Sequence, residues 1–240
     1  MCKSRKHDNK GFTLVEMIII VAIMAVLAAT IAMNVVHYIE KGRESKDLYH
    51  ASLIKDALNV YPFPSNFAGS PVTGRDVNGV EKTYTRGWVY VDRDEIRCSH
   101  PSCALALIDD GLVSVSPETE AELREAEQIG SDDNVNVWPH NFSGDYVGIT
   151  SNNEGKFVCD LHSYARRRWN TYQLDVFVSD DDGTLHLGAN ASNMDGRADG
   201  DFSTDIDVET SEYFANALGF TNSIRIGLGP EDRNLVDGNN

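Results

Sequence analysis

Residues 10–36 of this 240-residue chain read KGFTLVEMIIIVAIMAVLAATIAMNVV. From Leu14 to Val36 the side chains are almost all apolar, and Glu16 carries the one charge inside that run. Phe12 to Ala32 alone is 21 residues, and a helix of about 20 apolar residues spans the roughly 30 Å hydrocarbon core of a bilayer. The stretch therefore predicts a membrane-spanning N-terminal helix. This helix determines on which side of the membrane the rest of the chain lies.

The segment before Gly11 carries four basic residues and one acidic residue. By the positive-inside rule, this bias keeps the N-terminus in the cytoplasm and places the C-terminal mass outside. A secretory signal peptide starts in the same way, but this apolar run is longer than a signal h-region and no strict Ala-x-Ala site follows it. Composition alone also leaves open a plain single-pass anchor.

Gly11-Phe12-Thr13-Leu14-Val15-Glu16 resembles the processing motif of type IV prepilins and secretion pseudopilins. The resemblance covers residues 1–60 and is closest to the type IVa class. It implies cleavage after Gly11 by a prepilin peptidase, N-methylation of Phe12, storage in the cytoplasmic membrane, and assembly with other pilin subunits on an inner-membrane platform. The product would be an extracellular filament or a structure of the cell envelope.

Glu16 is central to that implication. A carboxylate at membrane depth costs a few kcal/mol, so it requires a partner or a function. Cleavage would free an amine at Phe12, about one helical turn before Glu16. The Glu16 carboxylate of one subunit would then pair with the Phe12 amine of its neighbour, and the apolar surroundings would strengthen the attraction. A carboxylate that the interface merely tolerates is the alternative.

Beyond the apolar run, a second amphipathic pattern predicts that the helix continues from Phe12 to Val60 and packs on a head. Pro62 and Pro64 end the pattern. The predicted divisions are a leader at 1–11, a long helix at 12–61 with its membrane or filament-core part at 12–36, and an acidic extracytoplasmic head at 62–240. The apolar stripe of the second half consists of Tyr49, Leu53, Ile54, Ala57, Leu58 and Tyr61.

The head is predicted to be α+β, with an antiparallel sheet laid on the second half of the long helix. Loops at Ser151–Gly155 and Ser179–Gly183 are expected to form hairpins, and Ser116 is expected to cap a helix. Gly69–Val80 and Gly188–Thr210 are the least structured tracts by composition. Predicted strands are Trp88–Val91, Tyr146–Thr150, Lys156–Leu161, Gln173–Val178, Thr184–Leu187 and Ser223–Leu228. Predicted helices are Ser102–Ile108, Pro117–Gln128 and Ser211–Leu218.

The charge of the chain excludes one class of partner. The full chain has 21 basic and 37 acidic residues, a formal charge of −16. Without residues 1–11, 17 basic and 36 acidic residues remain, a formal charge of −19. Such a surface repels phosphates, so contact with nucleic acid is not expected. The one dense basic cluster of the head, Arg166–Arg168, is expected to pair with acidic loops or with a neighbouring subunit, unless it is a solvated strand end.

The mature head contains three cysteines, Cys98, Cys103 and Cys159. In an exported domain, one disulfide among them is the first interpretation. The donors of Cys98-x-His100-x2-Cys103 and Cys159-x2-His162 also suit zinc, although their spacing matches no standard finger. Reduced buried cysteines are the third alternative.

A second candidate metal site lies in a Gly-rich acidic loop. Carboxylate oxygens of this kind suit calcium, and secretion pseudopilins often bind calcium in the head, but the spacing does not follow an EF-hand. No other cofactor is expected. The candidate ligands are Asp195, Asp199, Asp201 and Asp205, with Asp207 close by.

No nucleophile–base arrangement stands out in the sequence, so an enzyme is not expected. The favoured function is that of a structural subunit of a type IV pilus-like filament. A pseudopilin of a type II secretion or competence system is the alternative within the same family. A membrane-anchored binding module or enzyme is the alternative from another class.

Overall fold

The computed structural model describes residues 12–64, 67, 70–75, 80–92, 95–129, 147–150, 158–159, 161, 168–192, 208–220 and 225–226. The chain divides into two units, Met1–Gly42 and Arg43–Asn240. Helix α1 (Leu14–Val60) is 47 residues long and continues through Asn34 and Gly42, which corresponds to about 70 Å of helix. The predicted long helix is confirmed.

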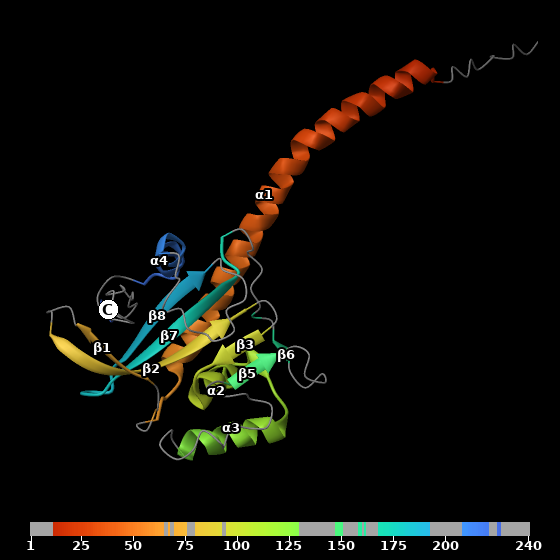
Figure 1. Ribbon diagram of the computed structural model, residues 1–240. Helices are drawn as coiled ribbons and strands as arrows, with labels where there is room; N and C mark the ends of the chain where they lie inside the picture. The colour runs from red at the N-terminus through yellow and green to blue at the C-terminus, as the bar shows by residue number, and fades with distance from the viewer. Residues whose placement is uncertain are drawn as a thin grey trace, which may run out of the picture. The chain divides into compact units, whose positions relative to one another are not determined.

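The second unit contains the part of α1 from Arg43 onward, and three further helices and nine strands among the described residues (Figure 1). The α+β class is confirmed, with an antiparallel sheet as its main element. In chain order after α1 the elements are β1 (Ser70–Arg75), β2 (Glu81–Val91), β3 (Glu95–Cys98), α2 (Pro101–Asp109), β4 (Val113–Ser114), α3 (Pro117–Ile129), β5 (Val147–Thr150), β6 (Val158–Cys159), β7 (Thr171–Ser179), β8 (Leu185–Ser192), α4 (Val208–Ala217) and β9 (Arg225–Ile226).

Strand β2 is the centre of the main sheet, which has seven described strands. One edge of β2 pairs with β7, and β7 pairs with β8 across the predicted Ser179–Gly183 hairpin. The other edge of β2 pairs with β1 along its first half and with β3 along its second half. β9 extends the sheet beyond β1, and β5 extends it beyond β3.

The core lies between one face of this sheet and the second half of α1. Because opposite residues of an antiparallel pair point to the same face, the register Val89–Leu174–Ala189 places three apolar side chains together. They join a buried cluster with Ile54 and Leu58 of α1. This burial of apolar area holds the second half of α1 in the head.

The buried stripe of α1 differs from the predicted one. Tyr49 is 62% exposed, and the inward face instead contains Asp47 and His50 as well as Ala51, Ile54, Ala57 and Leu58. Asp47 is buried because its Oδ2 accepts a hydrogen bond of 2.9 Å from Nε1 of buried Trp169. The sequence prediction counted apolar residues only, and it therefore included Tyr49 and left out Asp47 and His50. A polar side chain such as Asp47 can lie on the buried face when a buried partner satisfies it.

The opposite face of the sheet carries a buried carboxylate. Asp175 Oδ1 accepts from Arg86 Nε at 2.9 Å and from Gln173 Nε2 at 2.7 Å, and Oδ2 accepts from Asn190 Nδ2 at 2.8 Å. Arg86 Nη2 lies 2.8 Å from the same Oδ1. The hydrogen bonds and the Arg86 ion pair offset the cost of burying the Asp175 charge. Because the donors come from β2, β7 and β8, the cluster links these three strands.

Several expectations about the head were wrong. The expected loop Ser151–Gly155 lies outside the described residues, and the strands on its two sides do not pair with each other where they are described: β5 pairs with β3 in the main sheet, while β6 pairs with β4 in a separate two-stranded sheet. Gly69–Val80 contains β1, whose Pro and Gly lower its apparent strand propensity although β2 provides a long edge for pairing. Strands β3 and β4 were not predicted, and β8 and α4 extend into Gly188–Thr210 from its two ends.

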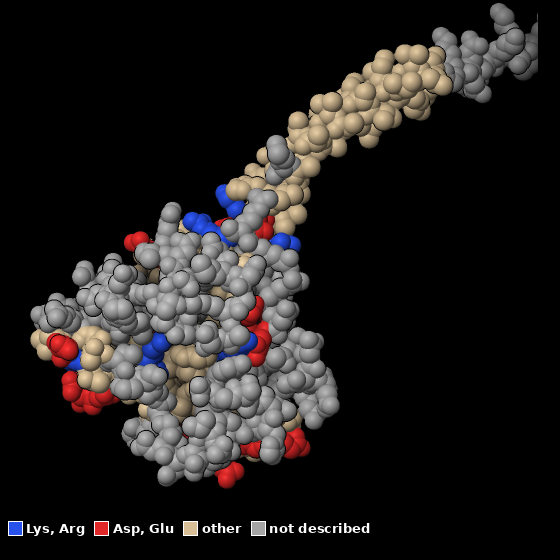
Figure 2. All heavy atoms as spheres, in the orientation of Figure 1, with Lys and Arg blue, Asp and Glu red and all other residues tan. Residues whose placement is uncertain are grey.

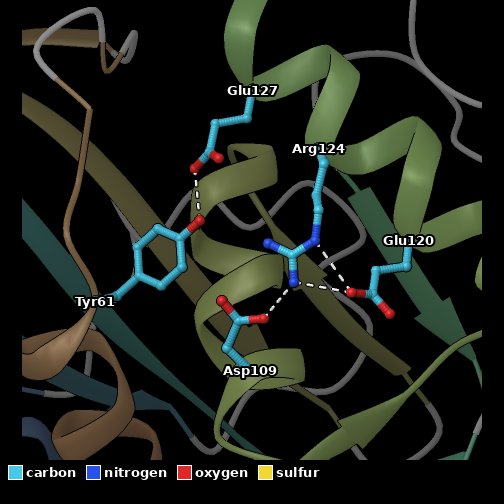
Figure 3. A network of polar contacts seen from close by, with 5 residues as sticks. All are labelled: Tyr61, Asp109, Glu120, Arg124 and Glu127. Carbon is cyan, nitrogen blue, oxygen red and sulfur yellow. Dashed lines mark hydrogen bonds and ion pairs between the residues drawn. The ribbon is translucent and has the colours of Figure 1, made fainter.

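The predicted helices of the head are confirmed as α2, α3 and α4. Ser116 caps α3 as expected, because its Oγ accepts a hydrogen bond of 3.2 Å from the Thr119 backbone N–H. A network of polar contacts then attaches α2 and α3 to the end of α1 (Figure 3). The Tyr61 hydroxyl donates to Glu127 Oε1 at 2.7 Å, and Arg124 pairs with Asp109 of α2 and Glu120 of α3.

Candidate functional site

The first turn of α1 is closed by a reciprocal pair of side chains, Thr13 and Glu16. The Glu16 backbone N–H donates to Thr13 Oγ1 at 3.3 Å, and the Thr13 backbone N–H donates to Glu16 Oε2 at 2.8 Å. The Thr13 hydroxyl also donates to Glu16 Oε2 at 2.7 Å. This is a capping box, in which the N-cap hydroxyl and the carboxylate three residues later satisfy each other's backbone amides.

The capping box gives Thr13 a role that the sequence interpretation missed. The Thr-x-x-Glu spacing was the available signal, because it marks a helix N-terminus. The contacts have a consequence for Glu16: both donors from Thr13 reach the same oxygen, Oε2. An ionised carboxylate has about four acceptor sites on its two oxygens. Glu16 can therefore hold its own helix end and still accept a donor from outside the chain.

The surface of α1 around this turn is apolar and exposed. From Phe12, which is 74% exposed, to Ile39, every side chain that the structure describes is exposed. Among the described residues, α1 is the one helix long and apolar enough to cross a membrane, and none of its most apolar window is buried within the chain. A helix buried in the core of a soluble protein would pass the length test but fail on exposure. The apolar surface of α1 therefore needs a bilayer or other apolar helices to cover it.

Gly11 lies outside the described residues, so the proposed cleavage point has no structural description. The predicted calcium ligands Asp195, Asp199, Asp201 and Asp205 also lie outside them, as does neighbouring Asp207. Calcium binding therefore stays a prediction. Within the described part of the chain, no group of three or more His, Cys, Asp and Glu side chains is placed to hold a metal ion.

Cys98 and Cys103 are buried thiols and are not joined in a disulfide. Burial raises the pKa of the Cys103 thiol to about 12, so it stays protonated and is a poor nucleophile. Cys159 lies in β6, where it pairs with Val113, and its side chain is outside the described part. A disulfide or zinc site that involves Cys159 stays a prediction.

His100 is occupied as a helix cap. Its Nδ1 accepts a hydrogen bond of 3.1 Å from the Ser102 backbone N–H at the start of α2, and burial lowers its pKa to about 4. The Ser102 hydroxyl is fully buried and donates to Glu127 Oε1 at 2.7 Å. A Ser, a His and a Glu therefore lie together, but the hydroxyl faces a structural acceptor and no solvent. The arrangement stabilises α2 and α3 and offers no accessible nucleophile.

Arg168 is the one described member of the predicted basic cluster Arg166–Arg168. Its Nη1 lies 3.7 Å from Glu44 Oε2, and its guanidinium carbon lies 3.4 Å from the centroid of the Tyr213 ring. The acidic partner thus comes from α1 of the same chain, whereas a loop or a neighbouring subunit was expected.

Comparison with known proteins supports the first turn of α1 as the functional region. A family model described as the prokaryotic N-terminal methylation motif matches residues 6–32. This range includes Gly11, Phe12, Thr13 and Glu16. No curated protein and no solved structure matches the chain.

Proposed function

Because the chain carries the N-terminal methylation motif that is the signature of type IV pilins and pseudopilins, we propose that it is a structural subunit of a type IV pilus-like filament. A prepilin peptidase cleaves it after Gly11 and methylates the new amine of Phe12. The mature subunit is stored in the cytoplasmic membrane with its acidic head outside. Assembly then removes α1 from the bilayer and packs it against the same helix of other subunits.

The observation that carries the proposal is the exposed apolar face of α1 with Glu16 in its first turn. Such a helix is stable in a bilayer, and it is equally stable in a bundle of similar helices, because both surroundings cover apolar area. Transfer between the two therefore needs no refolding of the subunit.

Glu16 gives the assembly its register. Its carboxylate is held by Thr13 through Oε2, so it is oriented before a neighbour arrives. The free amine of a neighbouring Phe12 is a charged donor, and an ion pair in apolar surroundings is strong when both groups are also hydrogen-bonded. Apolar packing can hold two neighbouring helices together at many axial offsets. The ion pair between Glu16 and Phe12 favours the single offset at which the two groups meet.

The first test is the mass of the mature N-terminus. The expected result is a chain that begins at N-methylated Phe12, with the shear-released protein present in long filaments by electron microscopy. An intact Met1, or a terminus at another residue, would remove the filament function. Processed protein that stays in the envelope without long filaments would instead favour the pseudopilin of a secretion or competence system, which carries the same motif.

Two substitutions separate the charge of Glu16 from its capping role. Glu16→Gln keeps an acceptor at the third helical position, which suits a capping box, but removes the charge. Thr13→Ala removes the capping hydroxyl and keeps the charge. We expect Glu16→Gln to abolish assembly while the subunit remains membrane-inserted, and Thr13→Ala to reduce it less. Normal filaments from Glu16→Gln would show that the ion pair is not required.

A further inference from the structure

The polar side chains in the exposed apolar part of α1 lie on one side of the helix. Between Leu14 and Ile39 they are Glu16, Thr30, Asn34, His37 and Tyr38. All of them except Tyr38 follow one another at steps of 14, 4 and 3 residues, and at about 3.6 residues per turn they fall within an arc of about 60°. We call Glu16, Thr30, Asn34 and His37 the polar seam. Figure 2 shows one side of this stretch with no Lys, Arg, Asp or Glu side chain in view.

Apolar residues complete the polar seam at the spacing of a coiled coil. Those on the same side of the helix, between Glu16 and Thr30, are Ile20, Ile23 and Leu27. From Glu16 to His37 the positions advance in alternating steps of four and three residues, which is the pattern of two helices packed along their length. The apolar residues alone would not mark this side, because the whole run is apolar. The polar residues mark it, since polar groups within a membrane helix face other protein rather than lipid.

Asn34 has hydrogen-bonding groups that the chain does not use. The Thr30 hydroxyl donates to the Leu27 carbonyl at 2.9 Å, so its proton has an acceptor. Asn34 Nδ2 lies 3.5 Å from the Thr30 carbonyl oxygen, which is long for a hydrogen bond. Within the described part of the chain, the Asn34 carboxamide makes no other hydrogen bond. One N–H and the carbonyl oxygen therefore remain for a partner outside the chain.

This carboxamide lies at membrane depth. The stretch from Phe12 to Ile39 is 28 residues, or about 42 Å of helix, and a stretch longer than the roughly 30 Å hydrocarbon core is accommodated by tilting. Asn34 comes five residues before the end of this stretch, so the tilted helix holds it inside the outer part of the core. No water replaces a missing partner there. A second helix with polar groups at the same depth supplies one.

We propose that two membrane-stored copies of the chain pair along the polar seam, with their Asn34 carboxamides hydrogen-bonded to each other. The inference rests on the membrane-stored state of the proposed function and does not require the filament. A carboxamide carries both a donor and an acceptor, so two of them satisfy each other across a two-fold axis. An Asn at such a position also fixes the register of a parallel pair of helices.

Glu16 favours a second copy over other occupants of the polar seam. It belongs to the seam, and its proposed partner in the filament is another copy, so a second chain has to approach this side of α1. Its charge does not prevent pairing in the membrane, because it lies near the inner headgroup layer, where water and salt screen repulsion between two carboxylates. The rival occupants are a helix of another membrane protein and the lipid headgroups, which would solvate Asn34 without a protein partner.

The experiment uses the full-length, unprocessed chain in phosphatidylcholine vesicles at low protein density. A photo-crosslinking benzophenone residue replaces either Ile23, on the polar seam, or Val21, which lies about 160° away around the helix. Both side chains are exposed in the single chain. We expect covalent dimers from position 23 and lipid adducts from position 21. Sedimentation equilibrium of the unlabelled chain in detergent micelles measures the same association without the probe.

Three variants test the carboxamide itself. Asn34→Leu removes it and should lower the dimer yield about three- to tenfold, which is the range expected for an interhelical hydrogen bond in a bilayer. The matched control Asn34→Leu/Val35→Asn keeps the composition but turns the carboxamide about 100° off the polar seam, so it should dimerise as poorly as Asn34→Leu. Asn34→Gln keeps the carboxamide on the seam and should retain most of the dimer.

Equal dimer yields from positions 21 and 23, a dimer unchanged by Asn34→Leu, or its recovery in Asn34→Leu/Val35→Asn would each overturn the proposal. Lipid adducts from both positions would overturn it in favour of headgroup solvation. In cells, an adduct of position 23 with a different protein in place of the dimer would overturn it in favour of that protein.

The measurement separates this proposal from the proposed function. Because the chain keeps its leader, neither cleavage nor polymerisation enters, and a failure to form filaments would leave the result unchanged. Loss of the dimer with lipid adducts intact at position 21 would overturn the pairing and leave membrane storage in place. Absence of lipid adducts at position 21 would remove the membrane-stored state, and the pairing with it.

Discussion

Gly87 in β2 leaves no space for a side chain, and replacing it by alanine should destabilise the head. A Cβ built at Gly87 would lie 2.6 Å from Phe67 Cζ, 3.2 Å from Cys103 Sγ and 3.3 Å from Ser99 Oγ. Ordinary carbon–carbon contacts are about 3.5–4.0 Å, so Phe67 must retreat by about 1 Å. It is not free to do so, because its ring packs edge-on against Phe63 and His100, with centroid distances of 5.0 and 4.9 Å.

The expected loss follows from two opposing terms. Overpacking of a filled core costs about 1–3 kcal/mol, while alanine in place of glycine recovers about 0.5–1 kcal/mol of chain entropy. The two terms leave a net loss of up to about 2.5 kcal/mol in the free energy of unfolding. Because Phe67 is held by Phe63 and His100, Gly87→Ala should fall in the upper part of this range, at about 1–2 kcal/mol. The measurement is denaturant unfolding of the full chain in detergent micelles, followed by tryptophan fluorescence.

Two companion variants make this prediction specific. Gly42→Ala is the matched control, because nothing lies within 4 Å of a Cβ built there and alanine favours a helix, so it should stabilise α1 by up to about 1 kcal/mol. Phe67→Leu removes the clashing ring tip, so the double variant with Gly87→Ala should be less destabilised than the sum of the single changes. Wild-type stability of Gly87→Ala, or strict additivity in the double variant, would refute the packing argument.

Three further predictions concern buried or half-buried polar groups. Trp169→Phe removes the donor to buried Asp47 and should lower the free energy of unfolding by about 1.5–3 kcal/mol, measured by the same denaturant titration. Burial lowers the pKa of His100 from 6.5 to about 4, so between these values the unfolded chain takes up a proton that the folded chain does not. Stability should thus fall as the pH drops through this window, by up to about 3 kcal/mol in total, and His100→Asn should remove this component from melting curves recorded between pH 6.5 and 5. Lys55 Nζ donates to the Leu218 carbonyl at 2.9 Å, just after α4, so Lys55→Met should speed amide hydrogen exchange in α4 by about tenfold and leave β7 unchanged.

The sequence predicts where helices and strands lie better than it predicts which strands pair and which side chains are in contact. The length of α1, the helices α2 to α4 and the β7–β8 hairpin depend on local signals such as apolar period, caps and turn residues. β5 pairs with β3, and β6 pairs with β4, which are both far away in the sequence. The short segment between β5 and β6 has a length that suits a hairpin, but its length does not determine which strand each of them pairs with. Asp47 shows the same limit within a helix, because its burial depends on Trp169, 122 residues further along the chain.

The candidate site was predictable in part for a related reason. Glu16 is conspicuous because it is the one charge in an apolar run. Thr13 was overlooked although the spacing of a capping box was present, because Thr is unremarkable beside apolar residues. The roles of Cys98, His100 and Cys103 could not be separated by spacing alone. The structure assigns His100 to the cap of α2 and the two cysteines to the core.

The part of the chain that matches a family model buries none of its described side chains in the chain's own core. The match covers residues 6–32, and within it every described side chain, from residue 12 onward, is exposed. Packing inside the subunit therefore cannot dictate that these residues be apolar. Glu16 caps the start of α1 with Thr13, but a cap does not require a long apolar run after it. The requirement must come from outside the subunit, from surroundings that accept apolar side chains along the whole helix and one carboxylate near its start. A bilayer alone meets the first condition and opposes the second. The proposed bundle of identical helices, in which each would bring an amine to its neighbour's carboxylate, would meet both.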